Sequence, residues 1–299
     1  MSRVARALAM AAMALAATVS ATLPAGAQVA DLVDRTAFRV CADPANTPMS
    51  SQDGSGFENR IAELFAERLG RPLQYTWFPM ATGFIRQTLR AGRCDVVIGY
   101  AQGDELVLNT NHYYTSTHVI VVRADSDLAD ITSLTDPRLK GRRLGVIAGS
   151  PAATHIARNG LMATTHGYDL VVDRRVENPS GDMLDDLAAG RIDAAVLWGP
   201  IGGPLAKARP GLKSVPLLNE PGAPKLFYRI TMGVRQGELN WKHDLNSLIR
   251  RNQGEIDRIL IDAGVPILDD YGTTLKDPAP LRQPNPFTDP AAPDTAPAN

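Results

Sequence analysis

Two aromatic residues at equivalent positions of a repeated motif are the first candidates for contacting a ligand. Leu89 to Tyr100 reads LRAGRCDVVIGY and Leu187 to Trp198 reads LAAGRIDAAVLW, with Leu, Ala, Gly, Arg and Asp in register. Each copy predicts a helix that ends at a glycine, a tight turn and a short apolar strand of a parallel sheet. Tyr100 and Trp198 stand one residue beyond these predicted strands. We expect their rings to face each other across a cleft between two similar lobes.

The remaining candidates lie in loops at the same predicted sheet edges. Trp77 and Phe78 follow the second predicted strand and could extend the first wall, and Asp43 and Asn46 lie in the loop after the first strand. Alternatively, the aromatic rings pack inside each lobe. The turn Gly149-Ser150 starts a predicted helix, and the free amide nitrogens of its first turn could bind an anion. Alternatively, Ser150 is an ordinary N-cap and these amides contact solvent.

The common signatures of catalysis and metal binding are missing from the sequence. It holds no Gly-x-Ser-x-Gly elbow, phosphate loop, Cys-x-x-Cys pair or His-Glu-x-x-His motif, and its five histidines are scattered. The loop that starts at Asp53 has no Glu at its twelfth position, so it is not a calcium loop. We expect a protein that is not an enzyme, with no cofactor and no metal site. If an acid in the cleft were catalytic, Asp43 and Glu105 would be the candidates.

The first 27 residues read as a secretory signal peptide. Arg3 and Arg6 precede the apolar run 7–19, and Ala25-Gly26-Ala27 is a cleavage site of small residues, although a membrane helix is the alternative. Cleavage would change the formal charge from -1 to -3, because two arginines leave. The near-balanced, scattered charge argues against a nucleic-acid partner. We predict an exported, soluble chain in the periplasm, without a membrane span.

Export changes how the two cysteines are interpreted. Cys41 and Cys94 are an even pair in an oxidising compartment, which favours a disulfide. Their expected places in neighbouring strands could instead hold the Cα atoms beyond the roughly 7 Å limit for a bridge.

The elements that must position these residues follow a β-α-β-α-β order. We predict strands over 38–42, 73–77 and 94–99, a helix that Ser55 and Glu58 open as a capping box, and a helix over 83–91 capped by Thr82. A second unit has strands over 143–147 and, less distinctly, 170–172. Runs 119–123 and 227–234 would cross between the lobes as a hinge. The predicted fold class is α/β with two lobes, each a mainly parallel sheet flanked by helices: 28–121 and 229–276 form lobe 1, 122–228 form lobe 2, and 277–299 are disordered.

These elements resemble the periplasmic solute-binding proteins of ABC importers, amino-acid type. A closer resemblance is to the quinoprotein-dehydrogenase-associated binding proteins of the MoxJ/XoxJ type, through the motifs at 39–44, 56–59, 75–79 and 89–99. That resemblance implies a partner, a PQQ-dependent methanol dehydrogenase of the calcium or lanthanide type, and a chaperone-like role in maturing or activating it in methylotrophic bacteria. We also expect a monomer.

The residues that would hold an amino acid are not where that class of receptor needs them. The segment after the third strand, 101–106, lacks the arginine that takes a carboxylate, and the strand exit 197–200 lacks the acid that meets an ammonium. A closed cleft removes the carboxylate and the ammonium of an amino acid from water, which is tolerable only if each group finds a partner in the protein. We therefore expect an aromatic cleft for an apolar or peptide segment of the dehydrogenase. The alternative is an importer receptor for a small uncharged or anionic solute.

Overall fold

The computed structural model describes residues 32–281. The predicted signal peptide, residues 1–27, and most of the predicted tail lie outside the described residues. Within the described range, every helix is too short or too polar to cross a membrane.

Lobe 1 is built on parallel strands with one antiparallel neighbour. β4 (Leu73–Trp77), β1 (Phe38–Ala42) and β5 (Val96–Ala101) are parallel, and β12 (Phe227–Val234) pairs antiparallel with β5. The short strand β6 (Leu108–Asn109) pairs with β12, and β2 (Ala45–Asn46) pairs with β3 (Ser50–Ser51) in the loop after β1. The loops that follow β1, β4 and β5 therefore meet at one edge of the sheet.

Lobe 2 repeats this design. Its parallel strands are β9 (Thr165–Tyr168), β8 (Leu144–Ile147) and β10 (Ala194–Trp198). The next strand, β7 (Tyr114–Arg123), pairs antiparallel with both β10 and β11 (Leu212–Pro216). Alternate residues of β7 and β10 enter two different core clusters, one on each face of the sheet. This alternation follows from the period of two along a strand. The predicted α/β fold class with two lobes is thereby confirmed.

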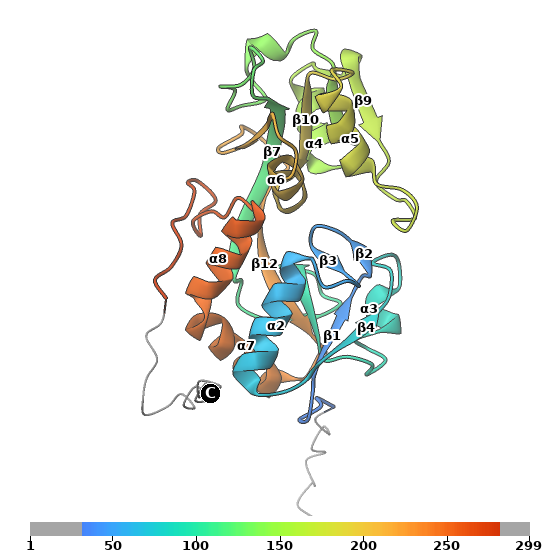
Figure 1. Cartoon of the computed structure of the whole chain (residues 1–299), viewed down its shortest axis with the longest axis vertical. Coiled ribbons are helices and arrows are strands. Elements are labelled where there is room, and N and C mark those ends of the chain that lie inside the picture. The colour runs from blue at the N-terminus through green and yellow to red at the C-terminus, as the bar shows by residue number, and fades with distance from the viewer. Residues whose placement is uncertain (1–31, 282–299) are drawn as a thin grey trace, which may run out of the picture. The chain divides into compact units, whose positions relative to one another are not determined.

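One strand belongs to both lobes. Tyr114 to Thr117 of β7 pair with β12, whereas His118 to Val122 pair with β10 (Figure 1). The apolar pattern predicted only 119–123, because the first half of β7 is polar. Two of these polar groups bind carbonyl oxygens inside the protein: Ser116 Oγ donates to Pro266 O (2.7 Å) and Thr117 Oγ1 donates to Leu217 O (2.9 Å). The hydroxyls of Tyr114 and Thr115 are buried with no hydrogen-bond partner among the described residues.

Helices cover both sheets. α2 (Phe57–Leu69), α7 (Leu239–Arg251) and α8 (Gln253–Ala263) lie together on lobe 1 and share a core cluster with β1, β5 and β12 (Figure 1). Lobe 2 carries α4 (Pro151–Arg158), α5 (Pro179–Ala188) and α6 (Gly199–Lys207), with the 3-10 turns η1 (Pro137–Leu139) and η2 (Met162–Thr164) in its loops.

The predicted start of α2 was wrong in its capping residues. Gly56 is the N-cap, and the Asn59 side chain accepts from the backbone nitrogens of Gly56 (3.2 Å) and Ser51 (2.9 Å). Glu58 does not close a capping box with Ser55, because its side chain turns into the core and only 6% of the residue is exposed. Asn59 is buried as well, so the polar pattern at this helix start does not mark a solvent-exposed end.

Three further boundaries differ from the prediction. The helix expected over 83–91 is a single turn, α3 (Phe84–Gln87), with Gly83 rather than Thr82 as N-cap. The strand suggested over 170–172 is loop, and β9 lies earlier, at Thr165–Tyr168. The repeat's strands, β5 and β10, include Tyr100 and Trp198 rather than ending before them. The aromatic residues thus take part in the sheet.

The first residues of the predicted disordered tail pack on lobe 1. Ala279 N donates to Asp257 Oδ2 (2.8 Å) in α8, and Lys276 Nζ lies 3.0 Å from the same oxygen. The start of the predicted tail is therefore anchored to α8 at Ala279, and residues 282–299 lie outside the described residues.

Candidate functional site

Asp43 and Asn46 are buried at the edge of lobe 1 where strand ends meet. Asp43 Oδ1 accepts from Ala45 N (2.9 Å) and Asp43 Oδ2 accepts from Met80 N (2.8 Å), which ties the loop after β1 to the loop after β4. Asn46 is 5% exposed, and its Nδ2 contacts Met49 Sδ at 3.8 Å. Both side chains are therefore held in fixed orientations.

An arginine of lobe 2 reaches these two residues. Arg174 lies in the loop between β9 and α5, and its Nη1 donates to Asn46 Oδ1 and lies 3.9 Å from Asp43 Oδ2. Arg174 was not among the predicted site residues. Its loop carries no motif, and the contact joins residues 128 positions apart.

A pocket of about 290 Å³ lies beside this contact and draws residues from both lobes. The residues that line it are Asp43, Pro44, Ala45, Pro79, Met80, Ala81, Val172, Asp173, Arg174 and Arg175. Of the predicted site residues it contains Asp43 and no aromatic ring. The pocket is thus charged and aliphatic where sequence analysis expected aromatic walls.

Trp198 contacts lobe 1 directly. Its ring makes edge contacts with His118 (centroids 5.4 Å apart) and Tyr228 (5.6 Å), and it packs against the core cluster of lobe 1. Burial lowers the pKa of His118, whose Nδ1 lies 2.8 Å from Leu226 O. Trp198 therefore belongs to the junction between the lobes.

Tyr100 lies in a different environment. It packs beside the cluster of Cys41, Phe84 and Leu89, and its hydroxyl donates to Asp104 Oδ2 (2.9 Å). Burial raises the pKa of Tyr100, and the Asp104 carboxylate adds to the shift. The contacts of Tyr100 and Trp198 thus do not support the expectation that their rings face each other.

The other aromatic candidates pack within lobe 1. Trp77 stacks on Tyr75 with ring centroids 4.3 Å apart, and Phe78 lies near Phe84 at 6.5 Å. Both remain partly exposed. These contacts match the alternative interpretation, in which the rings stabilise their own lobe.

The turn at Gly149 and Ser150 starts α4 in the expected way. Gly149 has a positive φ of 75°, and Ser150 Oγ accepts from Ala153 N (3.3 Å) as an N-cap. The side chain thus uses one of the amides that an anion would need, and anion binding at this turn stays a prediction.

Cys41 and Cys94 form a disulfide with their Cα atoms 5.5 Å apart. Thr76 Oγ1 donates to Arg93 O (2.8 Å), which places the chain just before β5 against β4 and next to Cys41 in β1. Cys94 itself precedes β5, so the large separation that was expected between positions in neighbouring strands does not arise, and the bridge lies within the distance limit.

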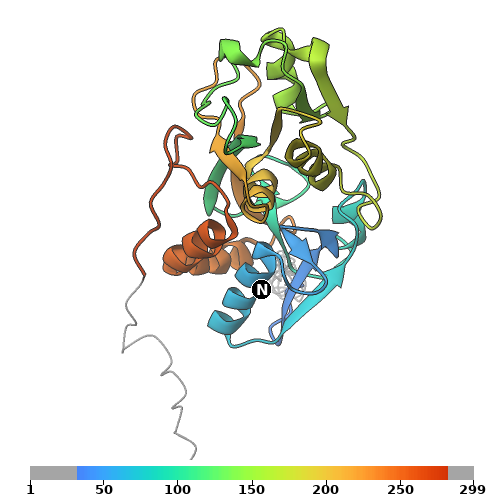
Figure 2. The same ribbon diagram turned by 45° about the horizontal axis from the view of Figure 1, so that its top comes forward.

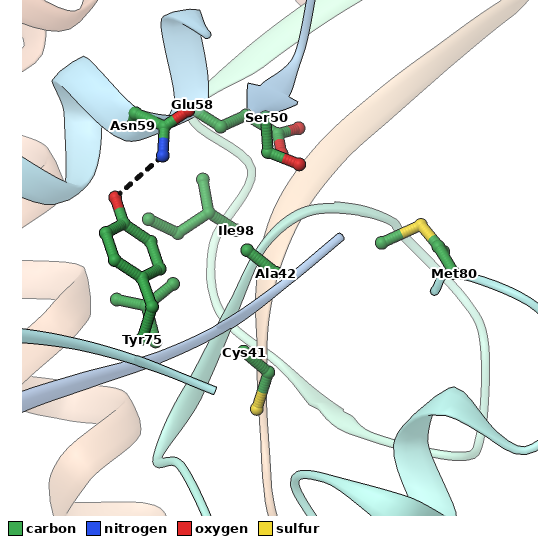
Figure 3. A pocket seen from close by; sticks show the side chains of 9 residues that line it. Cys41, Ala42, Ser50, Glu58, Asn59, Tyr75, Met80 and Ile98 are labelled. Atoms are coloured by element: carbon green, nitrogen blue, oxygen red, sulfur yellow. Dashed lines mark hydrogen bonds between the residues drawn. The ribbon is translucent and has the colours of Figure 1, made fainter. Parts of the chain in front are cut away.

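Sequence analysis also missed a buried acid in lobe 1. Glu58 lines a small cavity of about 10 Å³ with Ser50, Asn59 and Tyr75 (Figure 3). Asn59 Nδ2 donates to Tyr75 OH at 3.0 Å, whereas Glu58 Oε1 has no hydrogen-bond partner among the described residues. Burial raises the pKa of Glu58 to about 8. In sequence it looked like a helix-capping acid, and no other signal marked it.

No group of three or more His, Cys, Asp or Glu side chains within residues 32–281 is arranged to hold a metal ion. The contact beside the pocket instead joins one carboxylate, one amide and one guanidinium, those of Asp43, Asn46 and Arg174, which interact by hydrogen bonds and charge.

Residues 38–260 match the bacterial extracellular solute-binding proteins, family 3. The chain belongs to this family.

Its relatives include a protein named MoxJ and a periplasmic binding protein named XoxJ. It is 33% identical over 251 residues to Protein MoxJ of Methylorubrum extorquens, which covers 79% of this chain and 83% of that protein. It is 74% identical over 61 residues, 20% of this chain and 74% of the relative, to an uncharacterised protein from the cycB 3′ region of Paracoccus denitrificans. The crystal structure of the periplasmic binding protein XoxJ from Methylobacterium extorquens AM1 is similar with a TM-score of 0.67 and 39% identity, over 78% of this chain and all of XoxJ. This solute-binding protein is therefore of the MoxJ/XoxJ type.

Proposed function

We propose that this chain is a periplasmic binding protein that engages a PQQ-dependent methanol dehydrogenase and helps to mature or activate it. The observation that carries the proposal is the relationship to MoxJ and XoxJ, which extends over both lobes. The family to which the chain belongs generally binds rather than transforms its ligands, so we propose no catalytic step.

The pocket between the lobes supports a binding role of this kind. Its aliphatic lining, from Pro44, Pro79, Met80 and Val172, suits apolar groups, and its buried polar groups are few. The acids and arginines of the pocket are engaged with groups of the protein, Arg174 with Asn46 and Asp43 and Arg175 with Asp173, so they are not free to hold the charged groups of an amino acid. We propose that a segment of the dehydrogenase enters from this side, and that Trp198 supports the cleft from the junction.

A pull-down from periplasm tests the proposal. The full chain serves as bait, with expression of both proteins, and we expect methanol dehydrogenase among the bound proteins. Ala81→Glu places a long acid at the pocket without removing a hydrogen bond made by a side chain, and should reduce recovery at least tenfold. Ala124→Glu makes the same change at the end of β7, away from the pocket, and should have no effect.

Two results would contradict the proposal. Recovery of no dehydrogenase by the unmodified chain would count against the partner. Equal recovery with Ala81→Glu and Ala124→Glu would leave the partner but exclude this pocket as its binding surface. Trp198→Ala, assayed in parallel, tests the contribution of the aromatic ring.

A second function, a receptor for a small uncharged or anionic solute in an importer, is favoured by the family match over residues 38–260. A thermal-shift screen of the full chain discriminates between the two. A solute at a hundred times its Kd adds about 2.7 kcal/mol to stability, so one strongly stabilising metabolite would support the receptor function.

A further inference from the structure

The loop between β9 and α5 connects lobe 2 to lobe 1 at the rim of the cleft. Figures 1 and 2 both show this loop extending from lobe 2 towards β2 and β4. Its contact is made by a charged side chain: Arg174 Nη1 donates to Asn46 Oδ1 and approaches Asp43 Oδ2 to 3.9 Å. A guanidinium group of one lobe is thus bound by acceptors of the other.

The two acceptors, Asp43 and Asn46, are also held by groups of lobe 1 itself. The backbone nitrogens of Ala45 and Met80 hold one oxygen each of the Asp43 carboxylate, and Asn46 is held through Met49. Asp43 is only 3% exposed, so its negative charge is largely removed from water. A carboxylate in that position is stabilised by a cation that also forms hydrogen bonds.

Arg174 is the only residue in the described part of the chain that forms an ion pair with Asp43 within 4.0 Å. Its neighbour Arg175 lines the same pocket, but is engaged elsewhere: Arg175 Nε and Nη2 lie 2.8 and 2.6 Å from the two carboxylate oxygens of Asp173. The two adjacent arginines therefore differ in role, although both carry the same charge at the same pocket.

We propose that Asp43 and Asn46 form a binding site for a guanidinium group on lobe 1, and that Arg174 fills this site from lobe 2 of the same chain. The wild-type protein then excludes cationic solutes from the site and is held closed at this rim without any ligand. Once Arg174 is removed, the site accepts a free guanidinium, and the adjacent pocket of about 290 Å³ leaves room for its substituent. This inference does not depend on the proposed dehydrogenase partner.

Replacement of the tethered group by a free one provides the test. Arg174→Ala, Arg175→Ala and the wild-type chain are titrated with millimolar methylguanidinium, and with methylammonium as a probe of equal charge. The readouts are the midpoint of thermal unfolding and the NMR shifts of the Ala45 and Met80 amides, which contact Asp43. We expect Arg174→Ala to bind methylguanidinium at least about tenfold more tightly than the other two proteins, and to prefer it to methylammonium.

A double variant makes the result specific to Asp43. Adding Asp43→Asn to Arg174→Ala should abolish the gain, because the amide keeps the shape but loses the charge. The proposal is overturned if Arg174→Ala binds methylguanidinium no better than Arg175→Ala, or if the double variant binds as well as Arg174→Ala. Equal binding of methylammonium would also overturn it, since the site would then select charge alone rather than a guanidinium.

Discussion

The two copies of the repeated motif share their one acid, Asp95 or Asp193, and differ in their last residue, Tyr100 or Trp198. Asp95 of lobe 1 is paired with Arg39 at the start of β1, with distances of 2.8 and 2.7 Å to its two oxygens. Asp193 of lobe 2 is paired in the same way with Arg143, which precedes β8, at 3.2 and 2.7 Å. In both lobes, the acid of the repeat thus ties the start of one strand, β5 or β10, to the start of its parallel neighbour, β1 or β8.

The surroundings of these two pairs are different. A second arginine, Arg235, approaches Asp95 to 2.6 Å inside the core, whereas Asp193 has Arg123 only at 4.0 Å. The buried carboxyl groups of the described residues all lie in lobe 1, at Asp43, Glu58, Asp95 and Asp257. Lobe 1 therefore holds more fully buried carboxyl groups than lobe 2, in which the Asp193 side chain is 14% exposed.

The largest expected effect is a difference between two matched substitutions. Asp95→Asn removes the buried carboxylate that Arg39 and Arg235 share and leaves Arg235 with Glu238 alone, so it should lower the free energy of unfolding by about 3 kcal/mol. Asp193→Asn, beside a half-exposed Arg143, should lower it by about 1 kcal/mol or less. Urea unfolding measures both. Equal losses would show that burial does not separate the two copies.

The buried acid Glu58 should give lobe 1 a pH dependence that lobe 2 lacks. Its pKa is raised from 4.5 to about 8, so between these values the folded state holds a proton that the unfolded state has lost. Stability from this group is complete below about pH 4.5 and is lost as the pH rises to about 8, at about 1.4 kcal/mol per pH unit. Glu58→Gln should remove that slope in urea unfolding between pH 5 and 9.

Glu177→Gln, on the exposed loop of lobe 2, is the matched control for this change. It should leave the slope as it is in the wild-type chain. If Glu58→Gln keeps the wild-type slope, the carboxyl group is ionised in the folded protein and the contrast between the lobes loses one of its causes.

The smallest effects concern the divergent ends of the repeat. Trp198→Ala removes packing between the lobes and should cost roughly 2 to 3 kcal/mol. Tyr100→Phe removes only the partly exposed hydrogen bond to Asp104 and should cost less than about 1 kcal/mol. Hydrogen exchange should show protection lost at the junction in the first variant only. A similar loss in both would mean that the two rings serve the same purpose.

Much of the fold could be predicted because its signals are local. The repeat, the glycines that end helices and the apolar runs identify the α/β design and both lobes. The prediction failed where tertiary contacts overrule the local pattern. The polar half of β7 is a buried strand in which carbonyl oxygens of distant loops accept from two hydroxyls, those of Ser116 and Thr117. Glu58 is a core acid although it follows a helix cap.

The site was less predictable than the fold. Asp43 and Asn46 follow from their place after β1, since strand ends of a parallel sheet share one edge. Arg174 does not, because it comes from a loop without sequence signal and acts across the lobes. The environments of Tyr100 and Trp198 depend on Asp104, His118 and Tyr228, which lie outside the repeat.

The sharing of β7 by the two sheets has a mechanical consequence. Any separation of the lobes must twist this strand where its partner changes from β12 to β10, between Thr117 and His118. Hydrogen bonds from Thr117 and His118 to Leu226 O hold the chain before β12 against that point. Opening the lobes would therefore deform a strand whose side chains are anchored at the place where it has to bend.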